Sequence, residues 1–145
     1  MTDLRNTRTT ILNTGTPQAK REEILDYFHK TFTLDERLYD TLASDDAFYL
    51  RAEPIRQPPI FYLGHTGVFY INKLIIAKII DRRINPAFES MFAVGVDEMS
   101  WDDLDDTHYE WPAVQEVKAY RETVRTVVDA TIRNLPLTLP ITWDH

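Results

Sequence analysis

Hydrophobic residues recur at helical spacing in the first third of the chain. Thr16-Pro17 provides a hydroxyl that can cap a helix and a proline that suits its first turn. The apolar positions that follow share one arc of a 3.6-residue wheel; they are Ile24, Leu25, Phe28, Phe32, Tyr39 and Leu42. The pattern predicts an amphipathic helix over about 17–44.

Two further segments also predict helices. Residues 59–80 are apolar on nearly every side, as expected for a central helix, and Asn85-Pro86 is expected to stop it. A third helix is predicted from Pro112 to about Leu135; its periodic positions are Val114, Val117, Arg121, Val124, Val128, Thr131 and Leu135. Residues 45–58 and 85–111 are then connections, the second with a short apolar patch at 91–94 and a helical turn.

The expected fold is therefore all-α, with three long helices in one domain over residues 1–145. Such helices bury their apolar faces most simply in a bundle, usually of four. We therefore expect an incomplete bundle whose last helix is missing or supplied by a partner. Residues 1–15 are expected to be flexible, and the proline-broken segment 136–145 to form an extended tail.

Composition narrows the chemistry. Sixteen Lys and Arg against 23 Asp and Glu give a net charge of −7, which argues against a nucleic-acid partner. Without cysteine, a metal would have to be held by histidine or carboxylate. The apolar stretch 60–80 contains His65, Asn72 and two lysines, so a buried helix is favoured over a membrane span. A polar N-terminus lacks the features of a secretory signal, and a cytoplasmic location is expected.

His65 is the leading candidate for a functional residue, as a metal ligand. An imidazole within the apolar segment 61–69 needs a hydrogen bond or a metal to offset its desolvation. A core histidine bonded to a carbonyl or hydroxyl explains it as well. Gly64 and Gly67 indicate that another backbone or a ligand approaches closely beside His65, although tight helix packing explains them equally. No second histidine lies at i+3 or i+4, so a complete metal site is not visible.

A dense acidic and aromatic run covers residues 97–111. It can be read as a binding loop for a cationic substrate or partner, or as a solvated acidic loop. An EF-hand is excluded because no glycine occupies the required sixth position. No serine lies in a nucleophile elbow, so hydrolase chemistry has little support.

Two segments carry a resemblance to a known family. They are PIFYLGHTGVFYINKL at 59–74 and RINPAFESMFAVGVDEMSWDDL at 83–104. They resemble the N-terminal DinB-like region of the ovothiol synthases, 5-histidylcysteine sulfoxide synthases related to the ergothioneine-forming enzymes. The likeness extends from about Thr16 to His145.

The resemblance implies a DinB-like helical bundle joined to a C-terminal catalytic domain. It implies iron(II) held by three histidines, with His65 of the Gly-His-Thr segment as the first ligand. The other two belong to a His-x-x-x-His motif on the family's last bundle helix, which has no counterpart in residues 1–145. The implied reaction joins cysteine to histidine as a sulfoxide with dioxygen, and residues 1–145 alone are expected to be inactive.

Two other hypotheses stay open. In the first, the chain is a free-standing, non-catalytic helical module. It covers its exposed apolar face by self-association or by binding a partner. Alternatively, a homodimer could complete a metal site around His65 with His108 or His145.

Overall fold

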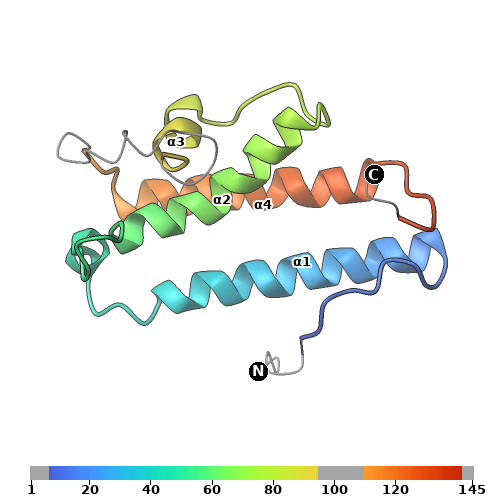
Figure 1. Cartoon of the computed structure of the whole chain (residues 1–145), viewed down its shortest axis with the longest axis horizontal. Helices are drawn as coiled ribbons and strands as arrows, with labels where there is room; N and C mark the ends of the chain where they lie inside the picture. Colours follow the sequence, from blue (N-terminus) through green and yellow to red (C-terminus); the bar gives the residue numbers. More distant parts are fainter. Residues whose placement is uncertain (1–6, 95–109, 142–145) are drawn as a thin grey trace. The chain divides into compact units, whose positions relative to one another are not determined.

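The computed structural model describes residues 7–94 and 110–141, and all regular elements in these ranges are helical (Figure 1). They are α1 (Pro17–Tyr39), the 3₁₀ helix η2 (Asp45–Tyr49), α2 (Pro59–Ile76), α3 (Pro86–Met91) and α4 (Val114–Asn134). The all-α class and the three long helices are thus confirmed. None of the helices in the described ranges has the length and hydropathy that a membrane span requires.

The chain divides into two compact units, which we describe separately. One unit contains residues up to Leu38 together with those from Arg125 onward, and the other contains Tyr39–Val124. Helix α4 contributes its first half to the second unit and its second half to the first. Residues 135–141, which follow Asn134, contain no helix.

In the unit formed by α1 and the end of α4, apolar and charged contacts join the two helices. Phe28 and Phe32 are buried on α1, with ring centroids 5.4 Å apart. The guanidinium of Arg125 lies 4.6 Å from the Phe32 ring and donates to Glu36 at 2.5 Å. Arg21 donates to the Leu135 carbonyl at 2.7 Å, at the end of α4 where backbone carbonyls lack helical partners.

Helix α1 ends five residues before the expected position, at Tyr39. Leu42, which the pattern placed on the helix, instead donates its backbone N–H to the Tyr39 carbonyl in a turn. The chain then forms η2, whose Phe48 is buried and stacks on Tyr39 with ring centroids 6.2 Å apart. Residues 45–49 are therefore a packed 3₁₀ helix within the expected connection.

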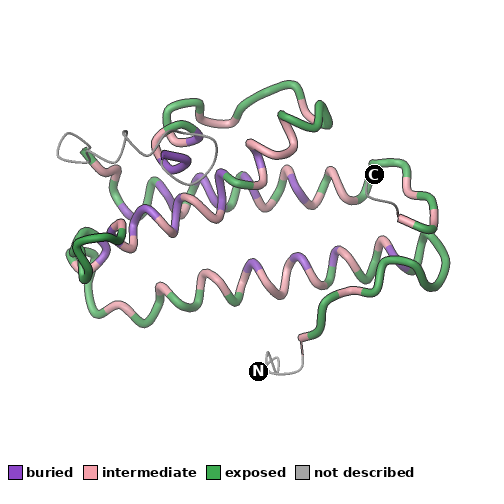
Figure 2. The backbone as a smooth tube through the Cα atoms, viewed as in Figure 1, coloured by how far each residue is buried: buried purple, intermediate pink, exposed green. Residues whose placement is uncertain are grey.

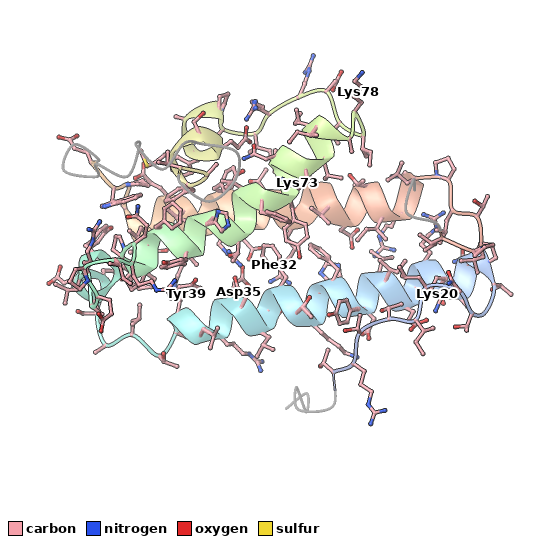
Figure 3. The ribbon with its side chains drawn as sticks, viewed as in Figure 1. Lys20, Phe32, Asp35, Tyr39, Lys73 and Lys78 are labelled. Carbon is pink, nitrogen blue, oxygen red and sulfur yellow. The ribbon has the colours of Figure 1, made fainter. Side chains whose placement is uncertain are left out.

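The end of α2 also corrects the sequence prediction. The helix stops at Ile76 because Lys78 adopts the left-handed conformation with a φ of 56° (Figure 3). The Lys78 N–H binds the Ile75 carbonyl and the Ile79 N–H binds the Leu74 carbonyl, both at 2.9 Å. This pair of bonds is the Schellman motif, in which glycine is the usual residue. Because a lysine stands where glycine is usual, the sequence did not indicate that the helix ends here.

Asn85-Pro86 begins a helix and does not stop one. The Asn85 side chain accepts the Phe88 N–H at 3.2 Å, and Pro86 occupies the first turn of α3. Both residues favour this role, because asparagine caps helix N-termini and proline lacks an N–H that the first turn would leave unpaired. The apolar patch after α3 is buried, with Phe92, Ala93 and Val94 in the core.

The buried residues of α2 lie in about the first two-thirds of the helix (Figure 2). They run from Ile60 to Ile71, whereas Ile76 is 56% exposed. The expectation that the whole segment is enclosed is therefore wrong at its end. The enclosed part is the part that carries His65.

Candidate functional site

His65 lies on α2 among aromatic side chains. The Phe61 ring stacks on the imidazole, with centroids 5.5 Å apart and an interplanar angle of 7°. Phe69 contacts it edge-on from the other side along the helix, at 6.3 Å. The imidazole itself is half-buried. Its surroundings are therefore apolar on the helix face, as the sequence predicts.

The imidazole has a defined orientation because Nδ1 lies 2.8 Å from the backbone carbonyl oxygen of Phe92. A carbonyl oxygen only accepts hydrogen bonds, so Nδ1 must carry the proton. In the neutral imidazole, Nε2 then holds the lone pair. This geometry satisfies the reading of His65 as a core histidine, and it is also the geometry of a metal-binding histidine.

The two glycines near His65 differ in how much space a side chain would have. A β-carbon at Gly64 would overlap the ring of Phe92, so glycine is needed for that ring to reach the α2 backbone. A β-carbon at Gly67 would be 3.4 Å from Cγ of Arg121, which is an ordinary contact distance. The close approach at Gly64 is made by a phenylalanine side chain, so the alternative of tight packing holds there and not the approach of another backbone or a ligand.

Asn72 follows His65 by two turns on α2 and also binds α3. Its Nδ2 donates to the Glu89 carbonyl at 3.0 Å, while its Oδ1 accepts from Arg83 at 3.2 Å. His65 and Asn72 thus both donate to backbone carbonyls at the end of α3. These two side chains of α2 therefore hold α3 through its backbone.

Glu89 is a buried carboxylate that the sequence analysis did not single out. Its side chain is 1% exposed, and Oε1 accepts the N–H groups of Ile84 and Asn85 at 2.8 and 3.0 Å. Arg83 reaches Oε2 at 3.3 Å, and the Tyr120 hydroxyl donates to Oε1 at 3.4 Å. The carboxylate is therefore bound from several sides. A glutamate four residues after a capping asparagine was the available signal, because acidic side chains favour the first turn of a helix.

Burial, with a smaller effect from the Glu89 charge, raises the pKa of Tyr120 far above its ordinary value of 10. The hydroxyl therefore stays protonated and acts as a hydrogen-bond donor at any physiological pH. Tyr120 is 5% exposed and contacts the Phe88 ring edge-on. The group stabilises α3 against α4 rather than supplying acid–base chemistry.

Arg121 is the most deeply buried cation of the second unit, at 1% exposure. Its Nη1 donates to the Leu63 carbonyl at 2.7 Å and to Oγ1 of Thr66 at 2.6 Å. The helical period placed Arg121 on the apolar face of its helix, and the structure confirms that position. Its guanidinium therefore binds α2 at residues two before and one after His65.

The remaining candidates do not join His65. In the first unit, His29 on α1 bonds Asp129 of α4 at 2.7 Å. Hydrogen bonds from Arg133 and His29 lower the pKa of Asp129 to about 2. His108, His145 and the acidic run at 97–109 lie outside the described residues. Within residues 7–94 and 110–141, no group of three histidine, aspartate or glutamate side chains is arranged to hold a metal ion.

Comparison with known protein families and with curated proteins finds no match for this chain.

Proposed function

We propose that this chain is the DinB-like helical region of a non-heme iron(II) sulfoxide synthase of ovothiol biosynthesis, with His65 as an iron ligand. The observation that carries the proposal is the hydrogen bond from Nδ1 of His65 to the Phe92 carbonyl. Metal-binding histidines commonly donate their second N–H to a backbone carbonyl or carboxylate, which fixes the ring. The sequence resemblance at 59–74 and 83–104 supplies the identity of the metal and the reaction.

The donor that His65 offers fits iron(II), since imidazole nitrogen is a common ligand of this metal. The resemblance places the other two ligands on a His-x-x-x-His motif, and the described residues hold no group of three side chains arranged for a metal. Bound iron would supply the activation of dioxygen for joining cysteine to histidine. The residues of this chain would hold the imidazole, through Phe92, and shield one side of it with the Phe61 ring.

The test is iron(II) affinity, measured anaerobically by calorimetry on the product of the complete natural gene. The informative variant is His65→Asn, because the asparagine amide can replace the Nδ1–H donor but has no counterpart of Nε2. We expect His65→Asn to lose iron binding at least tenfold while keeping the melting temperature near that of the parent. His29→Ala, which removes a histidine of the other unit, is the control and should bind iron normally. Unchanged affinity in His65→Asn would overturn the proposal.

A second test reads the natural gene past the codon for His145. The resemblance requires a downstream His-x-x-x-His that completes the iron site. A reading frame that contains it supports the proposal, and a stop codon without it contradicts the catalytic assignment.

A non-catalytic helical module is the second candidate. It is favoured by exposed apolar side chains, among them Leu38 at 62%, Leu50 at 67% and Ile55 at 88% exposure. Such residues can mark a protein–protein interface. Sedimentation equilibrium over a range of concentrations tests this candidate, because self-association through these residues would give concentration-dependent mass. A constant monomer mass would exclude self-association through these residues. Iron binding at His65 would then favour the first proposal.

A further inference from the structure

Two side chains of α2 hold the last turn of α3 by its backbone. Asn72 donates to the Glu89 carbonyl at 3.0 Å, and His65 donates to the Phe92 carbonyl at 2.8 Å. The last carbonyls of a helix have no partner within the helix, so they are open to such donors. The two donors lie seven residues apart on α2, whereas the two acceptor carbonyls lie only three residues apart, at the end of α3.

The first turn of α3 is held by further bonds, which centre on the Glu89 side chain. The Glu89 carboxylate accepts the N–H groups of Ile84 and Asn85, and it is also bound by Arg83 and the Tyr120 hydroxyl. These bonds fix where α3 begins. The carbonyls at its end lie beside α2 and accept from Asn72 and His65.

We propose that Asn72 is a positioning residue that sets the tautomer of His65 by holding the end of α3. The Glu89 and Phe92 carbonyls are three residues apart, so anchoring the first restrains the second at hydrogen-bonding distance from Nδ1. A neutral histidine in water favours the proton on Nε2, and a fixed acceptor at Nδ1 is what reverses this preference. Asn72 thereby keeps the lone pair on Nε2. The use of that lone pair for iron rests on the proposed function, whereas the tautomer does not.

Asn72 suits this role because both ends of its amide are engaged. Oδ1 faces the guanidinium of Arg83 at 3.2 Å, and this contact directs the amide NH₂ toward the Glu89 carbonyl. Arg83 also contacts the Glu89 carboxylate at 3.3 Å, so the same cation orients both groups. An aspartate at this position would have nearly the same shape and keep the Arg83 contact. It could not donate, and it would place a carboxylate oxygen against the Glu89 carbonyl.

The experiment measures the tautomer directly. Long-range ¹H–¹⁵N correlation spectra of ¹⁵N-histidine-labelled protein, recorded at about pH 8.5 where imidazoles are neutral, distinguish an Nδ1–H from an Nε2–H ring. We expect His65 to be an Nδ1–H tautomer in the parent protein. In Asn72→Asp the ratio of Nδ1–H to Nε2–H in His65 should fall about tenfold, because the hydrogen bond between Nδ1 and the Phe92 carbonyl is weakened. Tyr120→Phe removes a different donor, the hydroxyl that binds the Glu89 carboxylate, and should leave the tautomer ratio of His65 unchanged.

Outcomes on either side are informative. An Nε2–H tautomer in the parent protein, or an unchanged ratio in Asn72→Asp, would overturn the proposal. If Asn72→Asp does not fold, Asn72→Ala deletes the donor without adding charge, and the same loss of Nδ1–H is expected. Iron(II) affinity is measured on the same samples. Absence of iron binding in the parent would defeat the proposed function, while a tautomer shift in the variant would still establish the role of Asn72.

Discussion

The ring of Phe92 packs directly on the backbone of Gly64, so closely that a β-carbon there would overlap the ring. Phe92 is fully buried, and its carbonyl accepts the Nδ1–H of His65, the residue that follows Gly64 on α2. The ring and the carbonyl of one residue therefore contact two neighbouring residues of α2. Packing and imidazole orientation are linked at this point.

Substitution of the two glycines of α2 should separate close packing from helix propensity. Gly64→Ala should lower the free energy of unfolding by about 1–3 kcal/mol, because the Phe92 ring must shift within a packed core. Gly67→Ala should be neutral or stabilising by up to about 1 kcal/mol, since alanine favours helix and meets Arg121 only at contact distance. Urea denaturation followed by circular dichroism measures both. Equal losses in the two variants would contradict the packing argument.

The buried Arg121 should be essential for stability through its bonds to α2. Arg121→Ala removes the donor to the Leu63 carbonyl and to Thr66 and leaves a cavity, so we expect a loss of about 3 kcal/mol. Arg121→Met keeps much of the aliphatic volume and should lose clearly less. Thermal denaturation of the two variants provides the comparison. Equal losses in the two variants would show that the lost donor matters and the lost side-chain volume does not.

Asp129 should contribute to acid sensitivity. Its folded pKa, about 2, lies below the ordinary 3.8, so the folded state holds the ionised form more strongly than the unfolded state does. The resulting stabilisation is fully present above about pH 5 and is lost as the pH falls from about 4 toward 2. Asp129→Asn should therefore be less stable than the parent at pH 7, with a difference that shrinks below pH 4. A difference independent of pH would mean that the charge of Asp129 is not the stabilising feature.

Lys78 should be a site for simple stabilisation. Its φ of 56° costs a residue with a β-carbon about 1 kcal/mol, whereas glycine adopts this conformation freely. We expect Lys78→Gly to raise the free energy of unfolding by about that amount. Lys78→Ala keeps the β-carbon and is the control, which should show no gain. A stabilised Lys78→Ala would instead indicate that the lysine charge is unfavourable there.

The sequence by itself determined the helices. The periods of apolar residues place α1, α2 and α4, and Arg121 on the buried face of α4, because an amphipathic helix needs one continuous apolar arc. Proline signals gave the starts of α1 and α2 within a residue. The same signals misassigned Asn85-Pro86, since a proline preceded by a capping residue begins a helix as readily as it ends one.

Only the tertiary structure decided what the polar residues of α2 do. His65 and Asn72 share a helix face in the sequence, but the carbonyls that they bind belong to residues 89 and 92. The tautomer of an imidazole depends on the acceptor beside it, and the acceptor of His65 belongs to a residue 27 positions away in the chain. Sequence pattern indicates the local structure of that segment but not the helix on which it packs. Local pattern fixes which residues share a face, whereas packing between helices fixes which atoms meet.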